Sequence, residues 1–216
     1  KKPFLEKYVH VTTPEVYGST DGGWNKEHNP FAPRTPYAVS RAACDLHLHS
    51  FHQAYGFPVV FTRTANVYGP GQQLYRIIPR TLLSARTGEP MQLHGGGHSV
   101  RAFIHIKDVV RATLQLALEG EPGSTWHLST QESCSIKELV EQICNLTGAS
   151  FSELVQSSEE RLGKDQSYLL ESSAMRQVHG WSDQISLQHG LQETLAWVDA
   201  NLATLKTLPW SYQHKS

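Results

Sequence analysis

The chain lacks long apolar runs and any strong excess of charge of one sign. No apolar stretch approaches the roughly 20 residues that a bilayer-spanning helix needs, so we expect no transmembrane segment. The formal net charge is −1, which leaves no global basic field to attract nucleic acid or an anionic membrane surface. We therefore expect neither nucleic acid nor a membrane as a partner.

Cysteine is scarce, with only Cys44, Cys134 and Cys144. An odd number without a CxxC pair argues against a disulfide framework or a zinc knuckle and favours a reducing compartment, so we expect a cytoplasmic protein. Hydrophobic residues make up 39% of the chain and charged residues 18%. This composition is ordinary for a globular protein with a buried core.

The first third of the chain combines strand and helix patterns. Residues 8–13 are apolar and β-branched, as in a strand that is buried on both faces of a parallel sheet. Thr35 and the proline after it are typical of a helix start, and the helical pattern covers residues 36–55. Residues 57–62 have the pattern of another strand. This order predicts an α/β protein in which residues 1–68 form half of a doubly wound parallel sheet.

The later part of the chain alternates helix and strand patterns without repeats. Ser135 and Glu138 have the spacing of a capping box at a helix start. Polar residues 157–166 are typical of a surface loop. The other expected elements are helices at 78–87, 108–118 and 187–202, and strands at 91–95 and 101–106 joined by a hairpin turn at Gly95-Gly96-Gly97.

Tyr37 and Arg41 are four residues apart near the start of the predicted helix 36–55. Side chains at this spacing project from one helix face, and a neighbouring cation lowers the pKa of a phenol, which is about 10 when unperturbed. A tyrosine of this kind suits a general acid/base that acts on a sugar hydroxyl. An ordinary surface pair has the same spacing, so the pattern alone leaves both interpretations open.

Six ordered motifs together resemble the extended short-chain dehydrogenase/reductase family, and they span nearly the whole chain. They are Thr13-Pro14-Glu15-Val16-Tyr17-Gly18, Pro36-Tyr37-Ala38-Val39-Ser40-Arg41, Asn66-Val67-Tyr68-Gly69-Pro70, Ile78-Pro79, Arg101–Val109 and Gly180-Trp181. The resemblance implies a Rossmann-like fold and catalytic roles for Thr13, Tyr37 and Arg41, because a Ser/Thr at a strand end and a YxxxK motif form the family's active site. Tyr37 and Arg41 would also contact NAD.

Glu15 points to one reaction within this family. Sugar 4,6-dehydratases carry Thr-Asp-Glu or Ser/Thr-Ser-Glu before Val/Leu-Tyr-Gly, whereas 4-epimerases have small residues in place of the glutamate. Once C4 of a hexose is a ketone, the C5 hydrogen is acidic, and a carboxylate can remove it while the C6 hydroxyl leaves. The resemblance therefore implies that Glu15 is catalytic in an NDP-hexose 4,6-dehydratase. The alternative is a loop carboxylate without a target.

Two residues depart from the family pattern. Pro14 replaces the aspartate that many dehydratases have before the glutamate, so protonation of the leaving group would fall to Glu15, Tyr37 or water. Arg41 replaces the lysine of YxxxK; it keeps the positive charge but is bulkier and forked.

Residues on the substrate side follow from the same resemblance. Asn66 matches the asparagine near the sugar diphosphate, Arg76 stands where many dehydratases have lysine, and Arg101 and Arg161 match arginines that meet the nucleotide diphosphate. Arginine suits this role because its fork binds phosphate oxygens bidentately. Isolated arginines are more often solvated surface charges.

The sequence contains no GxGxxG or GxxGxxG motif. In the resembled family this glycine-rich turn lies upstream of the strand at which this chain starts, so we expect the N-terminal half of the nucleotide-binding sheet to be missing. The expected organisation is a partial NAD-binding domain over 1–68, a mainly substrate-binding α/β region over 69–204 with segments that return to the sheet, and a tail over 205–216.

Two other functions stay open. One is an NAD-dependent nucleotide-sugar epimerase or decarboxylase of the same family, and the other is a non-catalytic nucleotide-sugar-binding subunit. The nucleotide is also open among dTDP, CDP, GDP and UDP, because the chain has Trp126-His127-Leu128-Ser129 where thymidine-sugar dehydratases have Tyr-Asn-Ile-Gly.

The resemblance implies a homodimer formed through the helix 36–55, whose apolar residues include Leu46, Leu48 and Phe51. The alternative is that these residues pack on their own sheet. His47, His49 and His52 lie on the same predicted helix, but their spacing does not match a zinc-binding helix, so we expect no metal.

Overall fold

The computed structural model describes residues 4–20, 23–159 and 166–210. The chain divides into two compact units, each made of three segments. The first unit comprises Lys1–Val67, Ser99–Ser133 and Gly163–Gln184, and the second comprises Tyr68–His98, Cys134–Leu162 and Ile185–Ser216.

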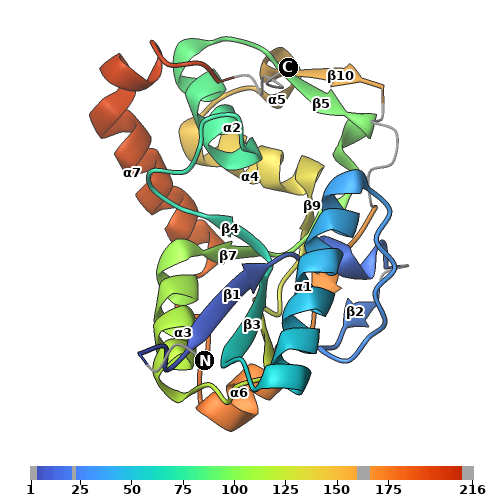
Figure 1. Ribbon diagram of the computed structural model, residues 1–216. Coiled ribbons are helices and arrows are strands. Elements are labelled where there is room, and N and C mark those ends of the chain that lie inside the picture. Colours follow the sequence, from blue (N-terminus) through green and yellow to red (C-terminus); the bar gives the residue numbers. More distant parts are fainter. Residues whose placement is uncertain (1–3, 21–22, 160–165, 211–216) are drawn as a thin grey trace. The chain divides into compact units, whose positions relative to one another are not determined.

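The elements follow one another in mixed α/β order (Figure 1). Those of the first unit are β1 Tyr8–Thr12, η1 Pro14–Tyr17, β2 Trp24–Asn25, α1 Pro36–Tyr55, β3 Val59–Thr64, β4 Asn66–Tyr68 at the unit boundary, β6 Val100–Arg101, β7 Phe103–His105, α3 Ile106–Glu119, β8 Thr125–Leu128, β11 Leu169–Leu170 and α6 Ser173–His179. Those of the second unit are α2 Ile77–Thr87, β5 Met91–His94, η2 Gly95–Gly97, β9 Cys134–Ser135, α4 Ile136–Thr147, α5 Phe151–Leu154, β10 Val155–Ser158 and α7 Leu187–Leu205.

The first unit is built on a parallel sheet in the order β1-β3-β8. The predicted succession of strand, helix and strand is confirmed, and with it the α/β class: β1 and β3 pair in parallel, with Tyr8 opposite Val59. The prediction that residues 8–13 are buried on both faces is wrong. In the described chain β1 pairs on one side only, and the side chain of Val11 is 53% exposed.

Helix α1 has the bounds that its flanking residues predict. The Thr35 side chain accepts a hydrogen bond from the backbone N–H of Ala38 at 3.1 Å, and Pro36 occupies the first turn, where no N–H donor is needed. Gly56 ends the helix in the left-handed conformation, with φ of 60°. This helix therefore starts close to the point where the chain leaves β1.

The second unit contains a parallel pair of strands, β5 and β10, which are far apart in the sequence. Met91 lies opposite Val155, and His94 opposite Ser158. The predicted hairpin at Gly95–Gly97 is wrong, because β5 pairs with β10 and the three glycines form a short 3-10 turn. The predicted surface loop begins too early, since its first two residues belong to β10.

The capping box at the start of α4 is confirmed. Ser135 accepts from the backbone N–H of Glu138 at 3.1 Å, and the Glu138 carboxylate accepts from the Ser135 N–H at 2.7 Å. The predicted helices at 78–87, 108–118 and 187–202 correspond to α2, α3 and α7, whose ends differ from the predicted ones by at most three residues.

Each unit has its own apolar core. In the first unit the core includes Val60, Ile104 and Leu116, and in the second it includes Met91 and Val140. Full burial of such a side chain contributes about 1.5–3 kcal/mol, so these clusters hold the sheets and helices of each unit together. Within the described residues, no helix combines the length and apolar character that crossing a membrane requires.

Candidate active site

A short turn at the carboxyl end of β1 holds two of the predicted catalytic residues. Thr13 caps η1, and its Oγ1 accepts from the backbone N–H of Glu15 at 3.4 Å. Gly18 closes the turn by donating its N–H to the Glu15 carbonyl at 3.1 Å. A Cβ at Gly18 would lie 2.3 Å from the carbonyl oxygen of Ala32, and its φ is 73°, so only glycine fits here. The turn holds Thr13 and Glu15 where ligands of parallel α/β sheets bind.

The first two turns of α1 carry the other two predicted catalytic residues. Arg41 donates from Nη2 to the carbonyl oxygen of Val11 on β1, which brings the helix motif to the strand end that leads into Thr13. Tyr37 is 55% exposed, and its hydroxyl is therefore accessible to a ligand. The first unit thus contains all four predicted catalytic residues, on two elements, η1 and α1, that pack against each other.

Two of the predicted substrate residues meet around a tyrosine. The Tyr168 hydroxyl donates to Asn66 Oδ1 at 3.3 Å, and the Arg101 guanidinium carbon lies 4.0 Å from the centre of its ring. Burial raises the pKa of Tyr168, the Arg101 cation opposes this rise, and the nearby Glu15 carboxylate adds to it. Asn66, Arg101 and Tyr168 therefore form one cluster within electrostatic reach of Glu15.

Arg101 is held firmly in this cluster. Arg101 is only 6% exposed, and its Nη1 donates to the backbone carbonyls of Val100 at 2.7 Å and Gln166 at 3.0 Å. Tyr168 is not predictable from the sequence, because the residue belongs to no recognised motif and follows a polar stretch that resembles a loop.

Arg76 and Arg161 are the two remaining predicted arginines. Arg76 is an exposed residue of the second unit, where it precedes α2 and its guanidinium carbon lies 5.6 Å from the Tyr75 ring centre. Arg161 lies outside the described residues.

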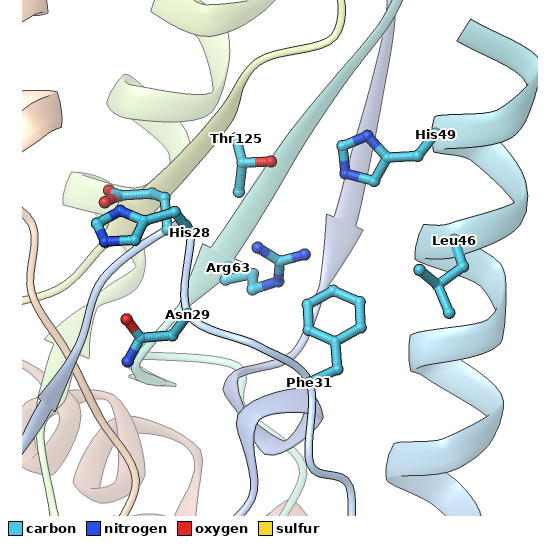
Figure 2. Close-up of a pocket in the computed structure, with 8 residues that line it drawn as sticks. His28, Asn29, Phe31, Leu46, His49, Arg63 and Thr125 are labelled. Atoms are coloured by element: carbon cyan, nitrogen blue, oxygen red, sulfur yellow. The ribbon is translucent and has the colours of Figure 1, made fainter. Parts of the chain in front are cut away.

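A cavity of about 340 Å³ lies beside α1 in the first unit, apart from this cluster. Figure 2 shows it between β3 and α1, with the Arg63 guanidinium near Phe31 and His49. Its lining residues are Glu27, His28, Asn29, Phe31, Leu46, His49, Arg63 and Thr125. Among the described residues, no predicted catalytic or substrate-binding residue lines it. In the described part of the chain, no three His, Cys, Asp or Glu side chains group as metal ligands would.

Comparison with known proteins decides the family. The sequence profile of the family described as GDP-mannose 4,6 dehydratase matches residues 4–194. This chain belongs to that family. The resemblance of the six motifs to the extended short-chain dehydrogenase/reductases is confirmed by the match.

The chain is also similar to individual nucleotide-sugar enzymes in sequence and in structure. A dTDP-glucose 4,6-dehydratase of Streptomyces niveus is 36% identical over 200 residues, which are 92% of this chain and 59% of that protein. The crystal structure of a dTDP-glucose 4,6-dehydratase from Bacillus anthracis in complex with NAD superposes with a TM-score of 0.89 at 31% identity, covering 94% of this chain and 65% of that one. The crystal structure of a UDP-glucose 4-epimerase from Thermus thermophilus in complex with NAD superposes with a TM-score of 0.84 at 26% identity. The match covers 90% of this chain and 64% of that one. The chain thus spans about three fifths of the length of the S. niveus relative.

Proposed function

We propose that this protein is an NAD-dependent nucleotide-sugar 4,6-dehydratase, a lyase that converts an NDP-hexose into its 4-keto-6-deoxy product. The observation that carries the proposal is the hydrogen bond from Arg41 to the Val11 carbonyl. It brings the helix with Tyr37 to the strand end that bears Thr13 and Glu15, so the acid/base pair for C4 and the carboxylate for C5 occupy one edge of the sheet.

The first step is oxidation at C4, for which bound NAD supplies the hydride acceptor and later the hydride donor to C6. Tyr37 takes the proton from the C4 hydroxyl, with Thr13 as hydrogen-bonding partner of that hydroxyl and Arg41 one helical turn away on the same helix face. Arg41 also fits the nicotinamide ribose, because its buried Nε has no hydrogen-bond partner among the described residues and can donate to a ribose hydroxyl.

The second step is loss of water across C5 and C6. Glu15 removes the C5 proton from the 4-keto sugar, the C6–O bond breaks, and the oxygen leaves as water after it gains a proton. Pro14 has no proton to give, so the proton comes from Glu15, from Tyr37 or from water. A proton returns to C5 when C6 is reduced, and the overall reaction is then balanced by the released water.

Substrate binding follows from the arginines and from the cluster around Tyr168. We assign Asn66 and Arg101, together with Arg76 and Arg161, to the sugar diphosphate, because a guanidinium fork matches phosphate oxygens. Asn66 and Arg101 belong to the same unit as the proposed catalytic residues.

A second candidate is a nucleotide-sugar 4-epimerase. Two observations favour it: Pro14 occupies the position of the dehydratase acid, and a UDP-glucose 4-epimerase is among the structural neighbours. An epimerase needs the C4 step alone, so Glu15 would have no proton to remove.

Product analysis separates the two candidates. The full-length protein is incubated with dTDP-, UDP-, GDP- and CDP-hexoses, and the products are identified by NMR and mass spectrometry. We expect a 4-keto-6-deoxy sugar from one nucleotide class, and Glu15→Gln should abolish this product without weakening binding of the nucleotide sugar. A 4-epimer without keto product would refute the dehydratase.

We further propose a cytoplasmic homodimer formed through α1. Leu46 is 60% exposed and Phe51 41% exposed on this helix, and such apolar surface is typical of an interface. Within the described structure, Cys44, Cys134 and Cys144 form no disulfide, which agrees with a reducing compartment. Sedimentation of the full-length protein with and without Leu46→Asp tests the interface.

A further inference from the structure

A buried arginine connects the two segments that carry the candidate catalytic residues. Arg63 on β3 is 1% exposed, and its Nη2 lies 2.7 Å from Oδ2 of Asp45 on α1, which is fully buried. Asp45 is one helical turn beyond Arg41 and two turns beyond Tyr37, so the three side chains share one face of α1. The ion pair at Nη2 of Arg63 thus anchors the helix that bears the proposed acid/base.

The other terminal nitrogen of Arg63 contacts the turn that bears Glu15. Its Nη1 donates to the hydroxyl of Tyr17 at 2.8 Å. Tyr17 is the last residue of η1, two positions after Glu15, and is 5% exposed. The guanidinium carbon of Arg63 also lies 5.1 Å from the Tyr17 ring centre and 4.9 Å from the Phe31 ring centre. Figure 2 shows this guanidinium between β3 and α1, beside Phe31.

A histidine completes the network and fixes the direction of its hydrogen bonds. His127 is fully buried, with Nδ1 3.0 Å from the Glu171 carbonyl and Nε2 2.8 Å from the Tyr17 hydroxyl. The carbonyl only accepts, so Nδ1 carries the proton and Nε2 accepts from Tyr17. Burial lowers the pKa of His127 to about 3 and raises that of Tyr17 to about 12. Neither group ionises near neutral pH, so the 2.8 Å contact between Tyr17 and His127 keeps its direction. The Glu27 carbonyl oxygen, 3.2 Å from the same hydroxyl, is a second acceptor for the Tyr17 proton.

We propose that Arg63 is a positioning residue that sets Glu15 relative to Tyr37. Nη1 of Arg63 donates to the Tyr17 hydroxyl on η1, and Nη2 pairs with the Asp45 carboxylate on α1. All three residues are buried, so both contacts are shielded from water. The inference rests on the proposed dehydratase function, in which Tyr37 acts at C4 and Glu15 at C5 of the same sugar ring. Catalytic groups that act together need their positions held to within about 0.5 Å. A buried guanidinium that contacts both segments can hold the two groups in this way.

Tyr17→Phe in the full-length enzyme tests this role, because it removes the hydroxyl and leaves the ring and the Arg63–Asp45 pair in place. We expect kcat for dehydration to fall roughly 10-fold, since small displacements of reacting groups have effects of this size, while KM for the nucleotide sugar stays unchanged. Hydrogen–deuterium exchange of the backbone amides in residues 15–18 should become faster, which reports on the turn independently of activity.

Thr62→Val is the matched control. Thr62 is the neighbour of Arg63 on β3, is fully buried and has an Oγ1 without a hydrogen-bond partner in the described structure. This variant should keep the kcat and the exchange rates of the wild type. A Tyr17→Phe enzyme with the kcat of Thr62→Val would overturn the positioning role, whether or not the amides exchange faster.

Failure of the proposed function looks different. A wild-type enzyme that forms no 4-keto-6-deoxy product would refute the dehydratase before any variant is compared. A wild type that forms it, with Tyr17→Phe unchanged, would refute only the role of Arg63.

Discussion

The tyrosine–arginine pair on α1 and the one formed by Tyr17 and Arg63 lie in the same unit, and their environments differ. Tyr37 is 55% exposed on α1, one helical turn before Arg41, whereas Tyr17 is 5% exposed and accepts a hydrogen bond from Arg63 at 2.8 Å. Burial raises the pKa of Tyr17 to about 12, so that phenol cannot exchange protons readily at neutral pH. Exposure, and not residue type, therefore distinguishes Tyr37, the proposed acid/base, from the buried Tyr17.

Tyr37→Phe is expected to have the largest effect. Removal of a general acid/base lowers kcat by about 10³-fold, and the exposed position leaves the melting temperature unchanged. Product formation and thermal unfolding of the full-length enzyme check both statements. Tyr55→Phe on the same helix, 67% exposed, is the control, and equal activity of the two variants would contradict the assignment.

Asp45→Ala is expected to destabilise the fold strongly, by about 3–5 kcal/mol, because it leaves the buried Arg63 cation without its partner. Urea unfolding of the full-length protein measures this loss. A change below about 1 kcal/mol would place the Arg63–Asp45 pair among the weak surface salt bridges. It would then remove the contrast between the buried Arg63 and the Tyr37–Arg41 pair on α1.

His127 should make the buried network sensitive to acid. Burial, with the nearby Arg63 cation, lowers its folded pKa to about 3, below the value of about 6.5 in an unfolded chain. The unfolded chain therefore takes up the proton first, and stability falls as the pH drops below 6.5, by about 1.4 kcal/mol per pH unit. Unfolding free energies at pH 7 and pH 5 should show a shallower fall for His127→Gln. Identical slopes for wild type and variant would refute this account.

The smallest effect is expected at an exposed ion pair of the second unit. Arg86 Nε lies 2.6 Å from Asp199 Oδ1, with side chains 27% and 44% exposed. Hydrogen bonding to Arg86 lowers the pKa of Asp199, so its contribution exists above the unfolded value and is lost as the pH falls through the folded one. Asp199→Asn should cost about 0.2–1 kcal/mol at neutral pH. A loss as large as that of Asp45→Ala would remove the distinction between buried and exposed pairs.

Local signals predicted much of the fold and of the candidate site. The bounds of α1 follow from Thr35 and Gly56, and the residues on η1 and α1 follow from contiguous motifs. Long-range pairing did not follow: β5 and β10 are about 60 residues apart, and nothing local shows that they pair. Arg63 was overlooked for the same reason, because a charged residue in a strand reveals neither of its buried partners.

The most direct test of the central claim is the reaction of the full-length enzyme in D₂O, followed by NMR of the product. If Tyr37 and Glu15 act on one sugar ring, the product is a 4-keto-6-deoxy hexose with deuterium at C5, and Glu15→Gln does not form it. A 4-epimer with hydrogen at C5 would contradict the account.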